Sequence, residues 1–592
     1  MYLFLYIFVV WAALLIAQSL SGNRSAAGGL PDLIANLTAA LRKPLDVRWT
    51  DQSMLSILVC TGAYIMGICI YAGQQDGARD GEEHGSATWA SPRQVNAMFA
   101  QKQNKLLTKN VRLGLDSRKH RRSLNVLVIG GSGAGKSRSY VKPNILEANT
   151  NYVVTDPKSE VLLATGGYLK GQGYDIRVLN LVNLEQSDSY NPFRYIRDEK
   201  DALRLVNNLI QATTPKGNHS SDPFWEKSET ALLQAIILML WQEAPEYEQN
   251  FSMVMRVLEY AEVKEEDEEY ISPLDMLFQA MEQEKPDSVA VRQYKVFKMA
   301  AGKTSKSILV STAVRLAPFN LPQIKAITDH DDMDLYTLGE KKCALYAVIP
   351  DNDNSLNFLV SLLYAQAFQA LYYSADQIHH GALPCHVHFV LDEFAAMPLP
   401  GFTRELATMR SRNISASTII QNMAQIKELY KDSWETIPGN SDTILYLGGN
   451  EASTHKYISE ALGKATIHTK THGQTKGKSG SYSTNFQMSG RELLTPDEVR
   501  GLDNRYAILF IRGAKPVMDL KYELTEHPAI RHTSDGGGSP YIHRQKKTEL
   551  KFQGEPLFAL GPKPTDEKEN TDDEESEELA EATEHPGAPD EA

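Results

Sequence analysis

The stretch that decides the fold is LNVLVIGGSGAGKSRS, residues 124–139, an apolar run that leads into a glycine-rich turn. Gly130 and Gly135 enclose four residues, and Lys136 and Ser137 follow directly, which is the complete P-loop spacing. Glycines let backbone N–H groups curl around a phosphate, lysine reaches the terminal phosphates, and serine can bind Mg²⁺. We therefore expect ATP and Mg²⁺ to be bound by Gly130, Gly131, Ser132, Gly133, Ala134, Gly135, Lys136 and Ser137.

A dinucleotide-binding fold is the alternative, because Asp156 follows where a ribose-binding acid would lie. The dinucleotide pattern G-x-G-x-x-G does not match here. If it began with Gly131 and Gly133, it would require glycine at position 136, where this chain has lysine. Asp156 belongs to VVTDPKSE, residues 153–160, in which a strand-like run meets proline and then Lys158. A right-handed crossover predicts that this strand lies beside the P-loop strand. Asp156 would then order the P-loop or the magnesium shell, and Lys158 would reach phosphate or an adjacent subunit.

An acidic pair follows another apolar run, HVHFVLDEFAAM at 386–397, which ends in Asp392 and Glu393. In phosphoryl transfer, positioning and charge supply most of the catalysis. We expect Asp392 to share the magnesium ion with Ser137, and Glu393 to polarise the attacking water.

Two further features surround the strand-like run ISASTIIQ at 414–421. A strand beside the P-loop and acidic strands would aim the Gln421 amide at the γ-phosphate as a sensor. The alternative is that Gln421 caps the next helix. Before this run lie Arg410 and Arg412, either of which could neutralise transition-state charge in a neighbouring subunit. The alternative for both is a surface arginine at a helix end.

The rest of the chain alternates strand-like and helical patterns, which predicts an α/β fold with a doubly wound, mostly parallel sheet. Between about 196 and 335 the strand signal disappears, and helical periodicity indicates an all-helical insertion. The additional strand-like runs are 175–180, 343–349, 442–447 and 506–511, with helical patterns at 356–373 and 451–462.

The N-terminal region contains two uncharged apolar segments, residues 1–23 and 52–75. Each is long enough to cross about 30 Å of hydrocarbon as a helix of about 20 residues. A cleaved signal peptide is the alternative for the first segment, but the segment lacks a positively charged N-terminal region and a clear small-residue cleavage site. The ATP site would place residues 76 onward in the cytoplasm.

The formal net charge of −13 is concentrated at the C-terminus. Residues 566–592 hold 13 acids and one lysine, so the preceding chain carries about −1. Such a segment buries too little apolar surface to fold and is predicted to be disordered, either as a solubilising tail or as bait for a basic partner.

Basic residues gather in two other segments. Residues 288–327 contain no acid, and this segment, with Tyr294 and Phe297 interleaved, would follow a phosphate backbone without reading bases; the alternative is a solvated face. Residues 464–491 also contain no acid and are predicted to form a polar, mobile loop. The basic residues of the first segment are Arg292, Lys295, Lys298, Lys303, Lys306, Arg315 and Lys325.

Together, these motifs resemble the coupling proteins of type IV secretion and conjugation, the TraG/TraD family, and in particular the subgroup from conjugative elements of Gram-positive bacteria. The resemblance covers roughly residues 120–530 and rests on GGSGAGKS, TDPKSE, SYNPF, DPFWEKSETALLQA, LDEFAAMP, RNISASTIIQN and GRELLTPDEVR. It implies a membrane-anchored homohexameric ring with a RecA-like motor. ATP hydrolysis would deliver relaxase-bound single-stranded DNA to the secretion channel. By position, Lys136, Ser137, Asp392, Glu393 and Gln421 match the family motifs, and Arg412 matches the arginine finger.

The expected organisation has five parts: a membrane anchor at 1–75, a RecA-like domain in two segments at 76–195 and 336–530, a helical insertion at 196–335, and a C-terminal extension with the acidic tail at 531–592. The alternatives to a translocase are a nucleotide-binding membrane receptor or scaffold that pumps nothing, and an FtsK-type DNA pump. Glu393 disfavours the scaffold, because a pure switch needs no hydrolytic base. The acidic C-terminus disfavours the FtsK type, which usually ends in a DNA-reading winged helix.

Overall fold

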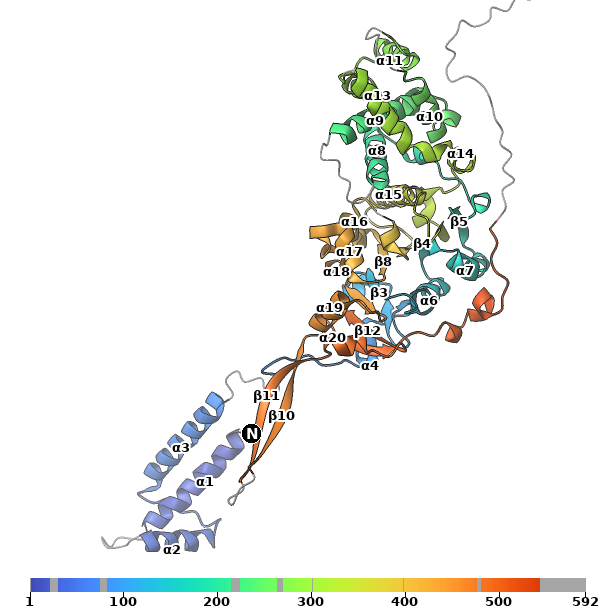
Figure 1. Cartoon of the computed structure of the whole chain (residues 1–592). Coiled ribbons are helices and arrows are strands. Elements are labelled where there is room, and N and C mark those ends of the chain that lie inside the picture. Colours follow the sequence, from blue (N-terminus) through green and yellow to red (C-terminus); the bar gives the residue numbers. More distant parts are fainter. Residues whose placement is uncertain are drawn as a thin grey trace, which may run out of the picture.

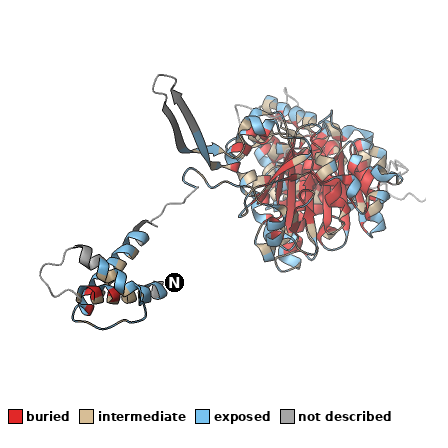
Figure 2. Ribbon diagram, turned by 90° about the horizontal axis from the view of Figure 1, so that it is seen from below, coloured by how far each residue is buried: buried red, intermediate tan, exposed pale blue. Residues whose placement is uncertain are grey.

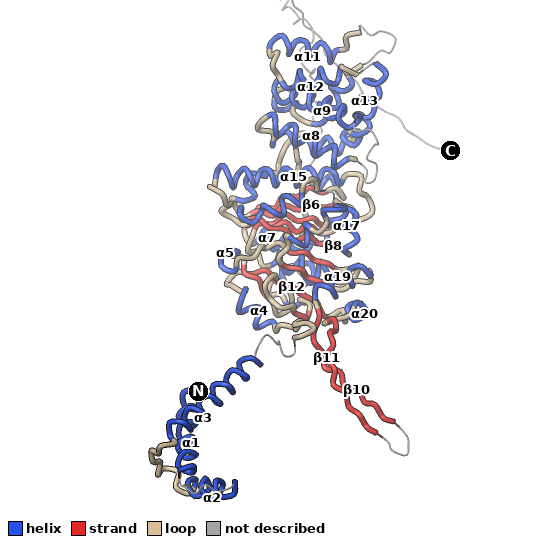
Figure 3. The backbone as a smooth tube through the Cα atoms, turned by 90° about the vertical axis from the view of Figure 1, so that its left-hand side faces the viewer, coloured by secondary structure: helices blue, strands red, loops and turns tan. Residues whose placement is uncertain are grey.

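The computed structural model describes residues 2–21, 30–74, 82–214, 224–262, 270–300, 302–397, 399–475 and 481–543. A large sheet lies at the centre of the molecule, and a group of helices stands at one end (Figure 1). Two long N-terminal helices and a long hairpin extend from the other end (Figure 3). The acidic tail at 566–592 and the acidic residues 263–269 lie outside the described residues.

The central sheet has nine strands among the described residues, in the order β13-β12-β9-β3-β8-β7-β4-β6-β5. Every pairing from β9 to β5 is parallel, whereas β12 is antiparallel to both of its neighbours. The strands are β3 (Val126–Ile129), β4 (Asn151–Pro157), β5 (Asp175–Asn180), β6 (Cys343–Ile349), β7 (Val387–Leu391), β8 (Ile414–Ile420), β9 (Thr443–Tyr446), β12 (Tyr506–Ile511) and β13 (Val517–Leu520).

Both faces of this sheet are buried, as the red strands in Figure 2 show. Along β3, Val126 and Val128 join one apolar core, and Leu127 and Ile129 join the other. Alternate side chains of a strand point to opposite faces, so a sheet covered on both sides requires continuous apolar runs. This requirement explains why the run at 343–349 is continuously apolar and why only His388 interrupts the apolar residues of 387–391; the strands predicted there are confirmed.

The predicted position of β4 is wrong. β4 pairs with β6 and β7, and the neighbours of the P-loop strand β3 are β8 and β9. The handedness of a crossover decides on which side of the sheet the connecting helix lies, but not how many strands are skipped. Two later strands, β7 and β8, lie between β3 and β4. The prediction that the strand before Gln421 lies beside the P-loop and acidic strands is confirmed, since β8 pairs with β3 and with β7.

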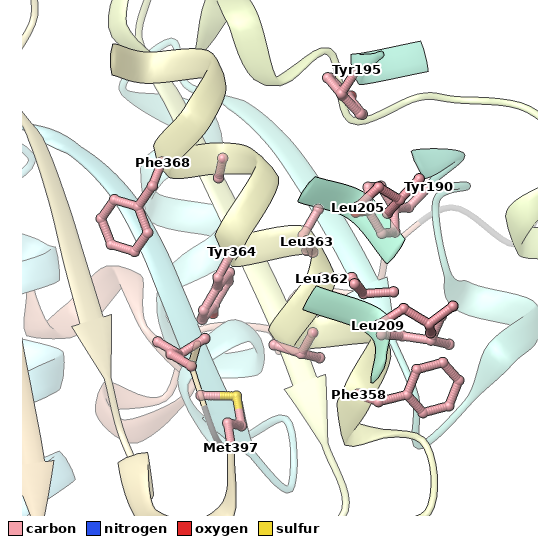
Figure 4. Packing of buried hydrophobic residues seen from close by; sticks show 14 of the residues in the cluster. Tyr190, Tyr195, Leu205, Leu209, Phe358, Leu362, Leu363, Tyr364, Phe368 and Met397 are labelled. Atoms are coloured by element: carbon pink, nitrogen blue, oxygen red, sulfur yellow. The ribbon is translucent and has the colours of Figure 1, made fainter. Parts of the chain in front are cut away.

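Helices cover both faces of the sheet (Figure 3). On one face, Phe358, Leu362 and Tyr364 of α15 pack with Leu205 and Leu209 of α8 in the larger core (Figure 4). The helices around the sheet are α4 (Pro92–Phe99), α5 (Ser117–His120), α6 (Lys142–Leu146), α7 (Glu160–Gly171), α15 (Asn357–Tyr373), α16 (Phe402–Thr408), α17 (Met423–Tyr430), α18 (Thr436–Gly439), α19 (Ala452–Leu462) and α20 (Pro496–Arg500). A small antiparallel ribbon of β1 (Asn104–Leu106) and β2 (Arg112–Gly114) lies between α4 and α5 in the chain.

Between β5 and β6 the described chain contains helices and no strand. A buried ion pair between Arg315 of α13 and Glu229 of α9, at 2.8 Å, joins two of these helices. They are α8 (Glu199–Thr213), α9 (Phe224–Glu243), α10 (Phe251–Glu259), α11 (Pro273–Glu284), α12 (Val289–Lys298), α13 (Gly302–Arg315) and α14 (Pro322–Thr328).

Two N-terminal helices, α1 (Tyr2–Ser21) and α3 (Ser53–Gln74), are long and apolar enough to cross a membrane. They lie side by side, and the Tyr6 and Thr61 hydroxyls are 3.2 Å apart. A third helix, α2 (Leu30–Leu41), lies in the connection between them and was not predicted.

The prediction of a mobile loop at 464–491 is wrong. β10 (Lys464–Thr475) and β11 (Ser481–Glu492) form a long antiparallel hairpin that projects from the sheet (Figures 1 and 3). The segment is rich in glycine, serine, threonine and lysine, a composition typical of a loop, although Tyr482, Phe486 and Met488 alternate with polar residues along β11. The hairpin root also holds the chain that follows α3, because the Ala87 N–H donates to the Lys464 carbonyl at 3.0 Å.

Candidate nucleotide site

The P-loop follows β3 and is held by the ends of the strands on either side of it, β8 and β9. The Gly130 N–H donates to the Ile420 carbonyl at 3.0 Å, and the Gly131 N–H donates to the Gly448 carbonyl at 2.8 Å. Gly133 and Gly135 have φ values of 73° and 87°, which side chains with a Cβ rarely adopt. These contacts and the two glycines hold the loop in a tight curl at the carboxyl edge of the sheet.

Lys136 folds back over this loop. Its ammonium group donates to the carbonyls of Gly130, at 3.0 Å, and Gly131, at 3.4 Å. A flexible lysine chain held by two loop carbonyls is positioned to exchange them for a phosphate. The chain is helical from Ser137 onward, first in a wide turn, η1 (Ser137–Val141), and then in α6.

Ser137 and Asp392 meet across the strand ends. The Ser137 hydroxyl donates to Asp392 Oδ2 at 3.0 Å, and Asp392 Oδ1 accepts from the Glu393 N–H at 3.0 Å. Asp392 is 2% exposed. Burial raises the pKa of Asp392, and the Ser137 hydroxyl and the Lys136 charge oppose that rise. Two adjacent oxygen ligands of this kind fit Mg²⁺, which takes carboxylate and hydroxyl oxygens.

Glu393 faces the end of β8. Its carboxylate oxygens accept hydrogen bonds from the Gln421 amide, at 3.3 and 3.1 Å. Glu393 has a φ of 51°, a left-handed conformation that is costly for a residue with a side chain and often marks a functional site. The helix cap that was the alternative for Gln421 is made by Asn422, whose side chain accepts from the Gln425 N–H at 3.2 Å.

Asp156 lies at the end of β4 and is fully buried. Its two carboxylate oxygens accept the N–H groups of Val161, at 3.0 Å, and Leu162, at 2.7 Å, in the first turn of α7. Burial raises the pKa of Asp156 to about 7, although these two hydrogen bonds lower it. The described contacts therefore give Asp156 a structural role at α7, which sequence reasoning missed; its role toward the P-loop or the metal stays a prediction.

Lys158 occupies a strained position after Pro157. Lys158 and Ser159 have φ values of 70° and 64°, two consecutive left-handed residues. The Lys158 ammonium forms an ion pair with Asp351 at 2.8 Å, and the Glu393 charge also favours its protonated form, so the pKa of Lys158 is raised. Its predicted contact with phosphate or an adjacent subunit stays a prediction. Asp351 was not singled out, although it follows a buried strand just as Asp392 does.

The family described as "Type IV secretory system Conjugative DNA transfer" matches residues 80–523 of the chain. This match includes the P-loop, the acidic pair, Gln421 and the helices between β5 and β6. The chain belongs to this family.

Two VirD4 proteins are similar to this chain in sequence. The chain is 24% identical over 463 residues to protein VirD4 of Agrobacterium fabrum (strain C58 / ATCC 33970), covering 74% of this chain and 65% of that protein. It is 25% identical over 406 residues to VirD4 of Rhizobium radiobacter, covering 66% of this chain and 55% of that protein. The chain thus spans less than two thirds of the length of these relatives.

The fold of this family member is also similar to that of a solved coupling protein. The unbound form of the bacterial conjugative coupling protein TrwBdeltaN70 superposes with a TM-score of 0.57 at 16% identity, covering 76% of this chain and 96% of that chain. Other TrwB structures contain ADPNP, with a TM-score of 0.56, or ADP and Mg²⁺, with a TM-score of 0.55, at 15% and 16% identity, each covering 76% of this chain and 96% or 95% of that chain.

The two candidate arginines have different surroundings. Arg412 forms a two-pronged ion pair with Asp376, its Nη2 at 2.7 Å from Oδ2, and its guanidinium lies 4.3 Å from the centre of the Tyr372 ring. Arg410 is exposed, and in the part of the chain that the structure describes it has no acidic partner. Arg412 is therefore held by side chains of its own chain, whereas the Arg410 side chain is exposed.

The basic segment 288–327 differs from the predicted DNA surface. Tyr294 and Phe297 are 6% and 2% exposed and belong to the core, so they offer no stacking surface for bases. Helical periodicity explains this, since residues three apart share a face of α12. Several of the basic side chains also pair with acids: Arg292 with Asp287, Lys295 with Glu282, Lys298 with Asp275 and Arg315 with Glu229.

Proposed function

We propose that this chain is a membrane-anchored, ATP-driven DNA translocase that couples relaxase-bound single-stranded DNA to a type IV secretion or conjugation channel. The observation that carries the proposal is the convergence of three adjacent strand ends: the P-loop after β3, Asp392 and Glu393 after β7, and Gln421 after β8. A nucleotide-binding scaffold has no use for a carboxylate held beside the phosphate loop by an amide. The family match supports DNA as the cargo.

The proposed chemistry assigns one task to each group. Lys136 leaves the Gly130 and Gly131 carbonyls and binds the terminal phosphates of ATP. Ser137 and Asp392 would hold Mg²⁺, which supplies neutralisation of phosphate charge when bound. Glu393 accepts a proton from the attacking water, and Gln421 holds the Glu393 carboxylate in position next to the γ-phosphate. These contributions are positional and electrostatic, as phosphoryl transfer requires.

The proposed assembly is a homohexameric ring at the cytoplasmic face of the membrane, anchored by α1 and α3. Arg410, exposed and lacking an acidic partner in the described chain, is the better candidate for the arginine that acts on a neighbouring subunit. The proposed division of the chain is the anchor at 1–75, the motor at 76–195 and 336–530, the helical insertion at 196–335, and the extension with the acidic tail at 531–592. The relaxosome and channel components are the proposed partners.

The deciding experiment is ATP hydrolysis by the detergent-solubilised full chain with and without single-stranded DNA. The proposal predicts hydrolysis that DNA stimulates and that Lys136→Ala and Glu393→Gln abolish, while Glu393→Gln still binds ATP. Hydrolysis that DNA leaves unchanged would contradict the translocase. DNA transfer that survives Glu393→Gln in a mating assay would instead support the scaffold.

A further inference from the structure

Lys521 contacts the P-loop at Ala134, although the two residues are 387 positions apart in the sequence. It follows β13 and is 6% exposed. Its ammonium group donates to the Ala134 carbonyl of the P-loop at 2.9 Å and to Asn504 Oδ1 at 2.7 Å. Its own N–H donates to the Arg505 carbonyl at 2.8 Å, which fixes the backbone from which the side chain extends.

A buried ammonium group is costly unless hydrogen bonds replace its water. Here one of the two acceptors is a main-chain carbonyl of the phosphate-binding loop. The burial of the ammonium group is therefore compensated only while the loop keeps this carbonyl turned toward Lys521. Burial lowers the pKa of Lys521 to about 8, and the nearby charges of Asp503 and Glu523 oppose this effect. The group therefore remains largely protonated at neutral pH and keeps a positive charge beside the loop.

The contact also sets the direction of the next N–H group. In a trans peptide, the C=O and the following N–H point in opposite directions. Because the Ala134 carbonyl points to Lys521, the Gly135 N–H points in the opposite direction, away from Lys521, within the same peptide plane. Successive N–H groups that line a concave loop form an anion-binding nest. Gly135 has no side chain, and its φ of 87° places the loop in a conformation that residues with a Cβ rarely adopt.

We propose that Lys521 is a positioning residue of the nucleotide site. It holds the Ala134–Gly135 peptide with the Gly135 N–H turned toward the phosphates of ATP, and it adds a positive charge behind them. This inference rests on the proposed ATP site. The proposal makes the sheet edge formed by β12 and β13 part of the nucleotide site. Asn504 lies just before β12, and Lys521 directly follows β13.

The test uses the full chain in detergent with the variants Lys521→Met, which removes the charge at similar length, and Lys521→Arg, which retains it. Lys142→Met is the matched control, because Lys142 is a largely buried lysine on the helix after the P-loop whose ammonium pairs with Asp535, at 2.7 Å, and not with the loop. The readouts are the Kd for a fluorescent ATP analogue, the KM for ATP and kcat.

Lys521→Met is expected to raise Kd and KM about tenfold, which is about 1.4 kcal/mol, because the variant loses a charged hydrogen bond to the loop. We expect kcat to change by less than about twofold, and Lys521→Arg to recover part of the affinity. An unchanged Kd, or an equal change in Lys142→Met, would overturn the inference. If Lys521→Met does not fold, Asn504→Ala, at an exposed position, is expected to weaken binding about threefold, and an unchanged Kd there overturns the inference as well. A wild type that binds nucleotide without DNA-stimulated hydrolysis would contradict only the translocase, since the Kd comparison still holds.

Discussion

The Gln421 amide nitrogen donates to both carboxylate oxygens of Glu393, at 3.3 and 3.1 Å. The two residues end neighbouring strands, β7 and β8, so the parallel pairing of the sheet brings them together. A carboxylate held on both oxygens has one preferred orientation. Gln421 is thus connected to the proposed catalytic base.

Replacing Gln421 should therefore slow hydrolysis without weakening nucleotide binding. We expect Gln421→Ala to lower kcat about tenfold, because positioning of a general base contributes on the order of 10²–10⁴-fold and only part of it is lost. Gln421→Glu should lower kcat further, since it places a second carboxylate beside Glu393. Steady-state hydrolysis and analogue binding measure the two effects separately. The neighbouring Gln425→Ala, whose side chain accepts the Gln421 N–H, is the control for local packing.

Substitution of Arg412 should lower the stability of the protein, and substitution of Arg410 should lower its activity. Arg412→Ala removes the ion pair with Asp376 and the contact with Tyr372, so we expect a loss of about 1–2 kcal/mol in unfolding free energy. Arg410→Ala should leave the melting temperature unchanged and reduce DNA-stimulated hydrolysis at least about tenfold. Mixing Arg410→Ala with Lys136→Ala subunits tests action in trans. If Arg410→Ala is fully active, Arg412 becomes the candidate for the arginine that acts on a neighbouring subunit.

Much of the nucleotide site could be predicted because each group directly follows a buried strand. A continuous apolar run is required by a sheet covered on both faces, and the first polar residue after it must lie at the sheet edge. The spacing of Gly130, Gly135, Lys136 and Ser137 adds backbone chemistry that few other sites need. Sequence patterns of this local kind located the strands that carry Asp392 and Gln421.

The remaining features depend on contacts that local patterns do not contain. The place of β4 in the sheet depends on where β7 and β8 insert, long after β4 in the chain. The tie between Arg412 and Asp376 joins residues 36 positions apart, and the contact between Lys521 and Ala134 joins residues 387 positions apart. The hairpin of β10 and β11 is rich in glycine, serine, threonine and lysine, so its strands resemble a loop in composition.

The unusual pKa of Asp156 predicts a specific pH dependence of stability. Burial raises this pKa from 3.8 to about 7, so between these values the folded chain holds a proton that the unfolded chain has lost. The contribution of Asp156 to stability is therefore present at low pH and is lost as the pH rises through about 7. Asp156→Asn is neutral at every pH and should lack this dependence.

The measurement compares the unfolding free energy of wild type and Asp156→Asn between about pH 5 and pH 8. We expect the difference, wild type minus variant, to fall with increasing pH, by at most about 1.4 kcal/mol per pH unit. A difference that rises with pH would mean that the hydrogen bonds from Val161 and Leu162 outweigh burial. Such a result would assign Asp156 a charged carboxylate at neutral pH.

The described part of the C-terminal extension packs across α7, and Gly166 makes room for it. The Tyr541 N–H donates to the Leu163 carbonyl at 3.0 Å, and His543 lies 2.8 Å from Asp188. A Cβ at position 166 would lie 2.7 Å from Cδ1 of Tyr541, closer than such atoms approach. Glycine therefore occupies this helical position because the tyrosine ring lies directly on the backbone.

Gly166→Ala should release residues 531–543 from the motor. The variant gains about 1 kcal/mol of helix propensity and loses about 1–3 kcal/mol to overpacking. Gly171→Ala, in the same helix, has no atom within 4 Å of its new Cβ and isolates the propensity gain. Limited proteolysis should cut Gly166→Ala sooner than Gly171→Ala within 531–543, and Gly166→Ala should melt at the lower temperature. Equal cleavage of the two variants would show that Tyr541 moves aside without releasing the segment.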